Sequence, residues 1–313
     1  MKKNIFSIVV TIILLCAFIY ADTAKAEANI SKRPGISFYE QKGEIYVKDT
    51  TIEELENLFK AVSYNDYIYM PNMLYPAIFL QKLPSNYAEL KDESYRNRLF
   101  IQILVPIAIK VKEDIEKERN ALFYIHEQFK KNTELTEAES VVLEDWAKVY
   151  DVYTPLKGSR RIEYLFEELK KKLDIIPVSM LIGVAAIESN WGTSRPALQA
   201  NGLYKEKVWF GEEKGLAPEG EDADDDYEFK IFDSIYDAMM SYSIKINSGI
   251  DYFYMREYRS EYRRRKGVIS GRTLAHSMMQ SSELKNFAGL LDYTITFYDM
   301  DNLDYAKLLR TEY

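Results

Sequence analysis

The stretch that decides the fold is Pro177-Val-Ser-Met-Leu-Ile-Gly-Val-Ala-Ala-Ile-Glu188-Ser-Asn-Trp191-Gly192-Thr-Ser-Arg195. Proline is favoured at the first position of a helix, and a glycine commonly follows the last one. The pattern therefore predicts an apolar helix that begins at Pro177, runs to Glu188 and ends in a break at Trp191-Gly192. One carboxylate stands at the end of this otherwise apolar segment.

Glu188 is the candidate general acid. Leu181 and Ala185 fall on the same helix face, so the carboxyl group should sit at the rim of a core. Desolvation and the negative end of the helix dipole both disfavour a charged carboxylate at such a place. A general acid needs a carboxyl group that keeps its proton near neutral pH. The alternative is a solvated glutamate that takes no part in chemistry.

The first 26 residues have the pattern of a secretory signal. Lys2 and Lys3 precede an apolar run over 5–21, and Ala24-Lys25-Ala26 fits a cleavage site. The sequence predicts an exported protein that begins near Glu27 and is found in the periplasm or cell envelope. No stable membrane span is expected after cleavage. The run reaches the minimum length of a span, so a retained anchor is the alternative.

Composition argues against several classes of function. The chain has 49 acidic and 41 basic residues, a net charge of −8, which argues against a nucleic-acid partner. The single cysteine, Cys16, lies in the signal. Only two histidines, His126 and His276, remain for chemistry, which argues against a histidine-rich metal site and a Ser-His-Asp triad. We therefore expect no metal and no cofactor.

Helical periodicity dominates the chain before the central stretch. Leu99, Ile103, Ile107 and Val111 recur at helical spacing, and Pro106 is expected to kink or divide that helix. The loop 151–161 is the predicted boundary. The expected parts are a signal peptide at 1–26, an N-terminal helical region at 27–158 and a domain with the site at 159–313.

Two charged segments follow the central stretch. Strand-like residues 208–210 and 229–232 flank an acidic loop at 211–228, which predicts a small β-lobe with a mobile tip. Residues 252–266 alternate tyrosines with arginines. This basic stretch is interpreted either as a contact for an anionic polymer or as a balance for the acidic loop.

The central stretch opens a longer pattern: Glu188-Ser-Asn-Trp-Gly-Thr-Ser-Arg195, then Asn201-Gly-Leu-Tyr204 and Phe232-Asp-Ser234. With these motifs the chain resembles the Bax-like glucosaminidases, among the peptidoglycan N-acetylglucosaminidases of glycoside hydrolase family 73. The resemblance is good over 160–300 and looser upstream. It implies an α+β, predominantly helical, lysozyme-like fold with a small β-lobe and an N-terminal helical extension. The implied substrate is the peptidoglycan glycan strand, cleaved at the β-1,4 bond between N-acetylglucosamine and N-acetylmuramic acid.

The resemblance also implies the catalytic groups. Glu188 corresponds to the general acid. The second acidic group lies in the β-lobe of the family, where Glu228 fits best by position and Glu219 and Glu221 stay open. Without a second carboxylate in reach, the 2-acetamido group of the substrate can serve as the nucleophile.

Three side chains are the expected sugar-binding residues: Trp191, Asn201 and Tyr204. Trp191 has an alternative as a core residue packed behind the helix. One stretch departs from the family, because many members carry a site tyrosine before the last helix and Met279–Phe287 has none. Tyr293 is the candidate substitute.

Two other functions stay open. One is a non-catalytic glycan-binding or scaffold protein of the cell envelope that keeps the lysozyme-like groove, which the missing tyrosine and the acidic loop favour. The other is a lytic transglycosylase, which also uses one glutamate after a helix. The Trp-Gly-Thr-Ser continuation argues against the transglycosylase.

Overall fold

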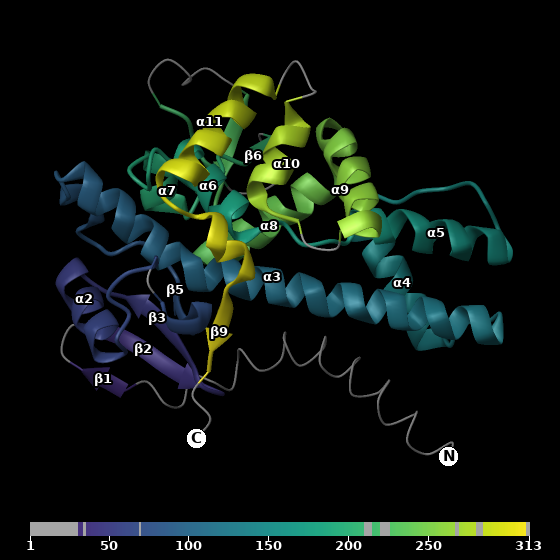
Figure 1. Cartoon of the computed structure of the whole chain (residues 1–313), viewed down its shortest axis with the longest axis horizontal. Helices are drawn as coiled ribbons and strands as arrows, with labels where there is room; N and C mark the ends of the chain where they lie inside the picture. The colour runs from purple at the N-terminus through teal and green to yellow at the C-terminus, as the bar shows by residue number, and fades with distance from the viewer. Residues whose placement is uncertain are drawn as a thin grey trace.

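A computed structural model describes residues 31–33, 36–68, 70–209, 215–219, 226–266, 269–279 and 284–310 (Figure 1). The signal peptide predicted at 1–26 and most of the predicted mobile loop lie outside these residues, so the signal and the mobility of the loop stay predictions. Within that loop, residues 215–216 and 227–228 belong to strands, so the prediction of a continuous loop over 211–228 is wrong. Within the described ranges, no helix combines the length and the apolar character that a membrane span requires.

The described chain is mainly helical, with short strands in three small sheets. The helices are α2 (Ile52–Ala61), α3 (Glu93–Asn132), α4 (Glu137–Val149), α5 (Gly158–Lys172), α6 (Val178–Glu188), α7 (Arg195–Ala200), α8 (Ile235–Ser248), α9 (Phe253–Lys266), α10 (Gly271–Met278) and α11 (Lys285–Phe297). Short 3₁₀ helices are η2 (Pro71–Met73), η3 (Tyr87–Glu89), η5 (Ile250–Tyr252) and η6 (Asp301–Tyr305). The predicted α+β, predominantly helical class is confirmed, and a lysozyme-like arrangement fits it.

The strands are β1 (Ser31–Arg33), β2 (Ile36–Gln41), β3 (Glu44–Asp49), β4 (Leu74–Pro76), β5 (Ile78–Leu80), β6 (Lys207–Trp209), β7 (Gly215–Leu216), β8 (Tyr227–Lys230) and β9 (Lys307–Leu309). The first sheet has the order β1-β2-β3-β5, and only the β3–β5 pair is parallel. β4 pairs in parallel with β9 from the C-terminal end of the chain. The antiparallel sheet β6-β8-β7 is the predicted β-lobe.

The long helix α3 crosses the molecule between the first sheet and the helices α6 to α11 (Figure 1). Pro106 lies inside it without dividing it, so of the two predicted outcomes the division is wrong, and the kink stays a prediction. Proline cannot donate the hydrogen bond that the carbonyl group of Gln102 would accept. The Tyr64 hydroxyl donates to that carbonyl instead (2.9 Å), and the Gln102 amide donates back to Tyr64 (2.6 Å). A distant side chain thus satisfies the group that proline leaves unpaired.

Two hydrophobic clusters share α3. Its first half, from Leu99 to Ile115, packs with residues 47–87 and 176–308 in the larger cluster. Its second half packs with α4 and α5 in the smaller one. The larger cluster therefore joins residues from both sides of the predicted boundary at 158/159. The domain ranges themselves stay predictions.

Three arginines of α3 and α9 converge on Asp174, which is buried between α5 and α6. Arg263 forms two 2.7 Å contacts with its carboxylate, and Arg119 and Arg259 lie 3.5 Å away. Arg119 and Arg259 also donate to carbonyl groups at the C-terminal end of α5. Arg256 and Arg259 are buried, so part of the predicted basic stretch is internal, whereas Arg264 and Arg265 are exposed. Neither interpretation of that stretch anticipated this.

We expect Asp174→Asn to lower the free energy of unfolding by about 3 kcal/mol, because removing one partner leaves buried cations uncompensated. Urea denaturation measures the loss. Asp145→Asn, on the exposed side of α4, is the matched control and should change stability by less than about 0.5 kcal/mol. An equal effect of both substitutions would contradict the structural role of the cluster.

Candidate active site

The helix that carries Glu188 is buried on every side, since each residue from Val178 to Ala186 is buried. Gly183 permits this, because a Cβ atom there would lie 2.7 Å from Leu291 Cδ1 of α11. The bounds of α6 match the helix predicted from Pro177 to Glu188. Apolar packing holds α6 in the core, but such packing is non-directional. Polar contacts at the two ends fix its position.

At its start, α6 is held by the buried carboxylate of Asp304. This group accepts hydrogen bonds from the Ser179 backbone (2.9 Å), the Ser179 hydroxyl (2.9 Å) and the Gly271 backbone (2.8 Å). Burial raises the pKa of Asp304 to about 6, against the lowering effect of these donors. One carboxylate therefore binds the first turns of both α6 and α10.

At its end, α6 passes into a tight turn. The Ser189 hydroxyl donates to the Ala185 carbonyl (2.6 Å) and accepts from the Gly192 backbone (2.8 Å). Three successive residues have positive φ: Asn190 (50°), Trp191 (57°) and Gly192 (79°). Left-handed conformations at non-glycine residues cost energy and gather at functional sites. The turn directs the chain away immediately after the Glu188 carboxyl group.

Glu188 is half-buried, and its carboxylate affects the pKa of two tyrosines. Burial raises the pKa of Tyr242 on α8 and of Tyr252 on η5, and the Glu188 carboxylate adds to both shifts. The two tyrosine hydroxyls lie within hydrogen-bonding reach of each other. Sequence reasoning did not identify either tyrosine as a neighbour of Glu188. The Phe232-Asp-Ser234 motif was the available signal for Tyr242, because α8, the helix that carries Tyr242, begins directly after it.

The three predicted sugar-binding residues all have structural contacts. Trp191 packs on Phe100 and Tyr298, with ring centroids 6.1 and 4.6 Å away. The Asn201 amide donates to the Phe232 carbonyl (3.0 Å), which ties the entry of the lobe to its exit. Tyr204 is buried, and its hydroxyl donates to a carbonyl group of α6 (3.2 Å). Their contact with substrate stays a prediction.

Tyr204 also connects the lobe to the tyrosine pair. Its ring stacks on Tyr242 with a centroid distance of 4.2 Å and an interplanar angle of 6°. Tyr204 and the tyrosine pair thus connect the first turn of the lobe to a region where the Glu188 carboxylate affects both tyrosines of the pair. This arrangement places an acid beside hydroxyl groups at the base of a β-lobe.

The candidates for the second acidic group differ in their surroundings. Glu228 lies half-buried on β8, and its carboxylate accepts a hydrogen bond from the Gly215 backbone (2.8 Å), which holds β7 on β8. Glu219 is exposed and pairs with Arg195 (3.2 Å). Glu221 lies outside the described residues. A catalytic role for Glu228 stays a prediction.

Two further residues of the lobe were missed by sequence reasoning. Glu206 is buried, accepts a hydrogen bond from Ser241 (3.0 Å), and burial raises its pKa. Trp209 on β6 is 63% exposed and offers an open aromatic face. Tyr293, the substitute considered for the missing family tyrosine, is exposed and stacks on Phe297 at 5.5 Å.

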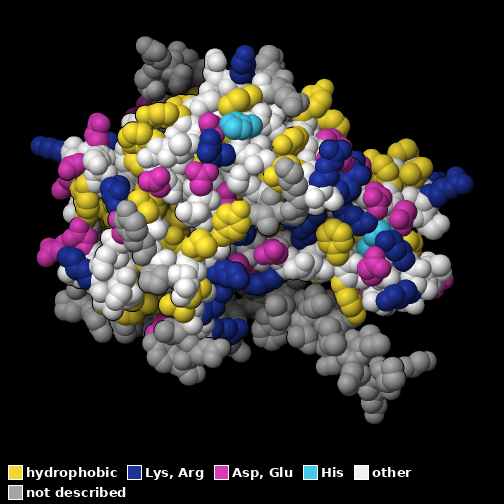
Figure 2. All heavy atoms as spheres, in the orientation of Figure 1, with side chains coloured by type: hydrophobic (Ala, Val, Ile, Leu, Met, Phe, Trp, Pro, Cys, Tyr) yellow, Lys and Arg dark blue, Asp and Glu magenta, His cyan; other side chains and the backbone are white. Residues whose placement is uncertain are grey.

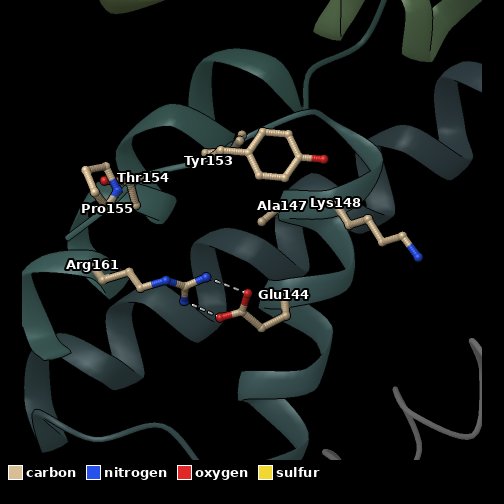
Figure 3. A pocket seen from close by; sticks show the side chains of 8 residues that line it. Glu144, Ala147, Lys148, Tyr153, Thr154, Pro155 and Arg161 are labelled. Carbon is tan, nitrogen blue, oxygen red and sulfur yellow. Dashed lines mark hydrogen bonds and ion pairs between the residues drawn. The ribbon is translucent and has the colours of Figure 1, made fainter. Parts of the chain in front are cut away.

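A separate pocket lies in the smaller hydrophobic cluster, between α4, the following loop and α5 (Figure 3). Tyr153 and Pro155 line one side of it, and Arg161 reaches across to the Glu144 carboxylate (2.7 Å). Neither Glu188 nor its tyrosine neighbours line this pocket. It is not part of the candidate active site.

Two comparisons with known proteins show what this part of the chain is similar to. Residues 163–309 match the glucosaminidase family model, described as mannosyl-glycoprotein endo-beta-N-acetylglucosaminidase. The chain is 28% identical over 183 residues to Protein bax of Escherichia coli (strain K12), covering 58% of this chain and 62% of that protein. The chain thus spans less than two thirds of this relative. No solved structure matches significantly. These matches support a glucosaminidase-type domain with a glycan-hydrolysing function.

The turn after Glu188 yields a stability prediction. A Cβ atom at Gly192 would lie 2.9 Å from Leu83 Cδ1 and 2.9 Å from Phe100 Cε2, at a φ of +79°. Gly192→Ala should therefore destabilise through both backbone strain and overlap, by about 2–4 kcal/mol.

Gly158→Ala is the matched control, because Gly158 also has a positive φ (+61°) but no atom within 4 Å of its Cβ position. It should cost only about 1 kcal/mol, the strain alone. Thermal unfolding of the two variants measures the difference. Equal melting temperatures would show that the turn tolerates the added methyl group.

Proposed function

We propose that this protein is a peptidoglycan hydrolase of the Bax-like glucosaminidases in glycoside hydrolase family 73. It cleaves the β-1,4 bond between N-acetylglucosamine and N-acetylmuramic acid and leaves a reducing N-acetylglucosamine end. The observation that carries the proposal is the position of Glu188. It is a carboxyl group at the end of a buried helix, beside a β-lobe, within the residues matched by the glucosaminidase model.

Glu188 acts as the general acid in this proposal. Its carboxyl proton passes to the glycosidic oxygen as the bond from the anomeric carbon to that oxygen breaks. The hydroxyl group added to the anomeric carbon comes from water. If a second carboxylate activates this water, the remaining proton passes to that carboxylate, and exchange with solvent restores both carboxyl groups. In the acetamido route, water opens the cyclic intermediate and its remaining proton passes to the Glu188 carboxylate. The first attack on the anomeric carbon comes either from water activated by a second carboxylate or from the 2-acetamido oxygen of the substrate.

Contacts in the lobe bear on that choice. Glu228 is the predicted second carboxylate, and it accepts a hydrogen bond from the Gly215 backbone. If Glu228 also activates water, its carboxylate must either bind both groups or release Gly215. The acetamido route needs no second carboxylate. Trp209 is an exposed aromatic side chain of the lobe, and we assign it to stacking on a sugar ring.

Glu188→Gln should keep the fold and lower hydrolysis by about 10²–10⁴-fold, because the nearly isosteric amide cannot deliver a proton. Release of reducing ends from purified peptidoglycan measures the rate, and product mass identifies the bond. Glu127→Gln, on the exposed side of α3, is the control and should cleave at the wild-type rate. A folded Glu188→Gln protein that still cuts normally would remove Glu188 from the mechanism.

Glu228→Gln distinguishes the two routes, since the amide oxygen can still accept from Gly215. A loss comparable to that of Glu188→Gln supports water activation by Glu228, and a small loss supports the acetamido route. Products with a 1,6-anhydro ring would identify a lytic transglycosylase. Glycan binding without cleavage by the wild-type protein would favour the non-catalytic scaffold. The hydrogen bond by which Glu228 holds the lobe together also favours that alternative.

Export to the periplasm or cell envelope is part of the proposal, since its substrate lies there. It is motivated by the charged start, the apolar run and the Ala24-Lys25-Ala26 site. N-terminal sequencing of the protein recovered from cells should find a chain that begins near Glu27. An intact Met1 on protein in the cytoplasmic fraction would refute export.

A further inference from the structure

His126 of α3 faces two glutamates of α5 in the smaller hydrophobic cluster, away from α6. Its Nε2 lies 3.2 and 3.3 Å from the two carboxylate oxygens of Glu163. Glu167 follows one helical turn later, and one ligand atom from each of the three residues lies within 4.8 Å of the others. Figure 2 shows acidic and basic side chains interleaved over this end of the molecule. The proposed function makes no use of this cluster.

The spacing fits a metal ion. Two ligand atoms that each lie about 2.0 Å from a tetrahedral zinc ion are about 3.3 Å apart. The distance from His126 Nε2 to Glu163 already has that value. We propose that His126, Glu163 and Glu167 bind a divalent transition-metal ion, with Zn²⁺ as the preferred ion and water in the fourth position. One imidazole with two carboxylates suits zinc better than the all-oxygen sites of calcium or magnesium.

The packing around His126 holds its ring in one orientation. It is 1% exposed and stacks on Phe166 with a centroid distance of 4.4 Å, which fixes the direction of Nε2. Its Nδ1 has no hydrogen-bond partner. Metal-bound histidines usually have one, so we expect weaker binding than at a closed structural zinc site.

Nearby cations compete with the ion. Lys170 pairs with Glu167 (2.7 Å), and Lys130, which also acts on His126, pairs with Glu127 (3.0 Å). Binding therefore requires that the ion replace Lys170 at Glu167. Exposed ion pairs contribute only about 0–1 kcal/mol, so this exchange costs little. The prediction of no metal rested on the low histidine count, and this site needs only one histidine.

The test uses the full chain freed of metal with a chelator and titrated with ZnCl₂ by calorimetry. We expect one ion per chain and a higher melting temperature with zinc. His126→Gln should abolish binding, and Glu163→Gln and Glu167→Gln should each weaken it about tenfold or more. Both glutamates are exposed, so these two variants decide the question even if His126→Gln fails to fold.

His276→Gln is the matched control. His276 also lies 3.2 Å from a carboxylate, that of Asp292, but belongs to no such three-residue group among the described residues. It should leave zinc binding unchanged. The absence of zinc binding to the wild-type chain, or equal binding by the Glu163 and Glu167 variants, would overturn the proposal. Neither result depends on hydrolytic activity, so the site is tested separately from the proposed function.

Discussion

The Asp304 carboxylate is the contact on which the position of Glu188 depends. Helix α6 is apolar along its length, and hydrophobic burial alone would not fix its rotation or its register. The hydrogen bonds from Ser179 and Gly271 provide that direction, and they are strong because the acceptor is charged. The helix that carries the candidate acid is therefore aligned by a residue more than a hundred positions later in the chain.

The environment of Glu188 is built mostly from backbone and tyrosine. The turn after α6 ends the helix beside the carboxyl group, and Tyr204 and Tyr242 join that end to the β-lobe. Side chains such as Asn201 and Glu228 hold the lobe together through hydrogen bonds. In this architecture the residues that define the motif make structural contacts. A substrate would therefore contact side chains that remain exposed, such as Trp209.

Local signals were sufficient for α6, because proline, apolar periodicity and Gly192 act within a few residues of one another. The β-lobe was predictable for the same reason. Long-range contacts could not be predicted in this way. The continuity of α3 through Pro106 depends on Tyr64, and the burial of Arg259 depends on Asp174. The partners of Glu188 belong to this second class, since Tyr242 and Tyr252 reach it only in the folded protein. A sequence pattern specifies an element more readily than the neighbours of that element.

The pairing of strand β9 has a consequence for the order in which the chain folds. Residues 307–309 pair with β4, and the Leu309 carbonyl also accepts a hydrogen bond from the Ala77 backbone (3.2 Å). The ribosome produces a chain from its N-terminus, so β4 has no partner until residues 307–309, more than two hundred positions later, have been synthesised. Closing so long a loop is slow and leaves unpaired strand edges open in the meantime. Deletion of residues 307–309 would therefore expose the edge of β4, a strand more than two hundred positions earlier in the sequence.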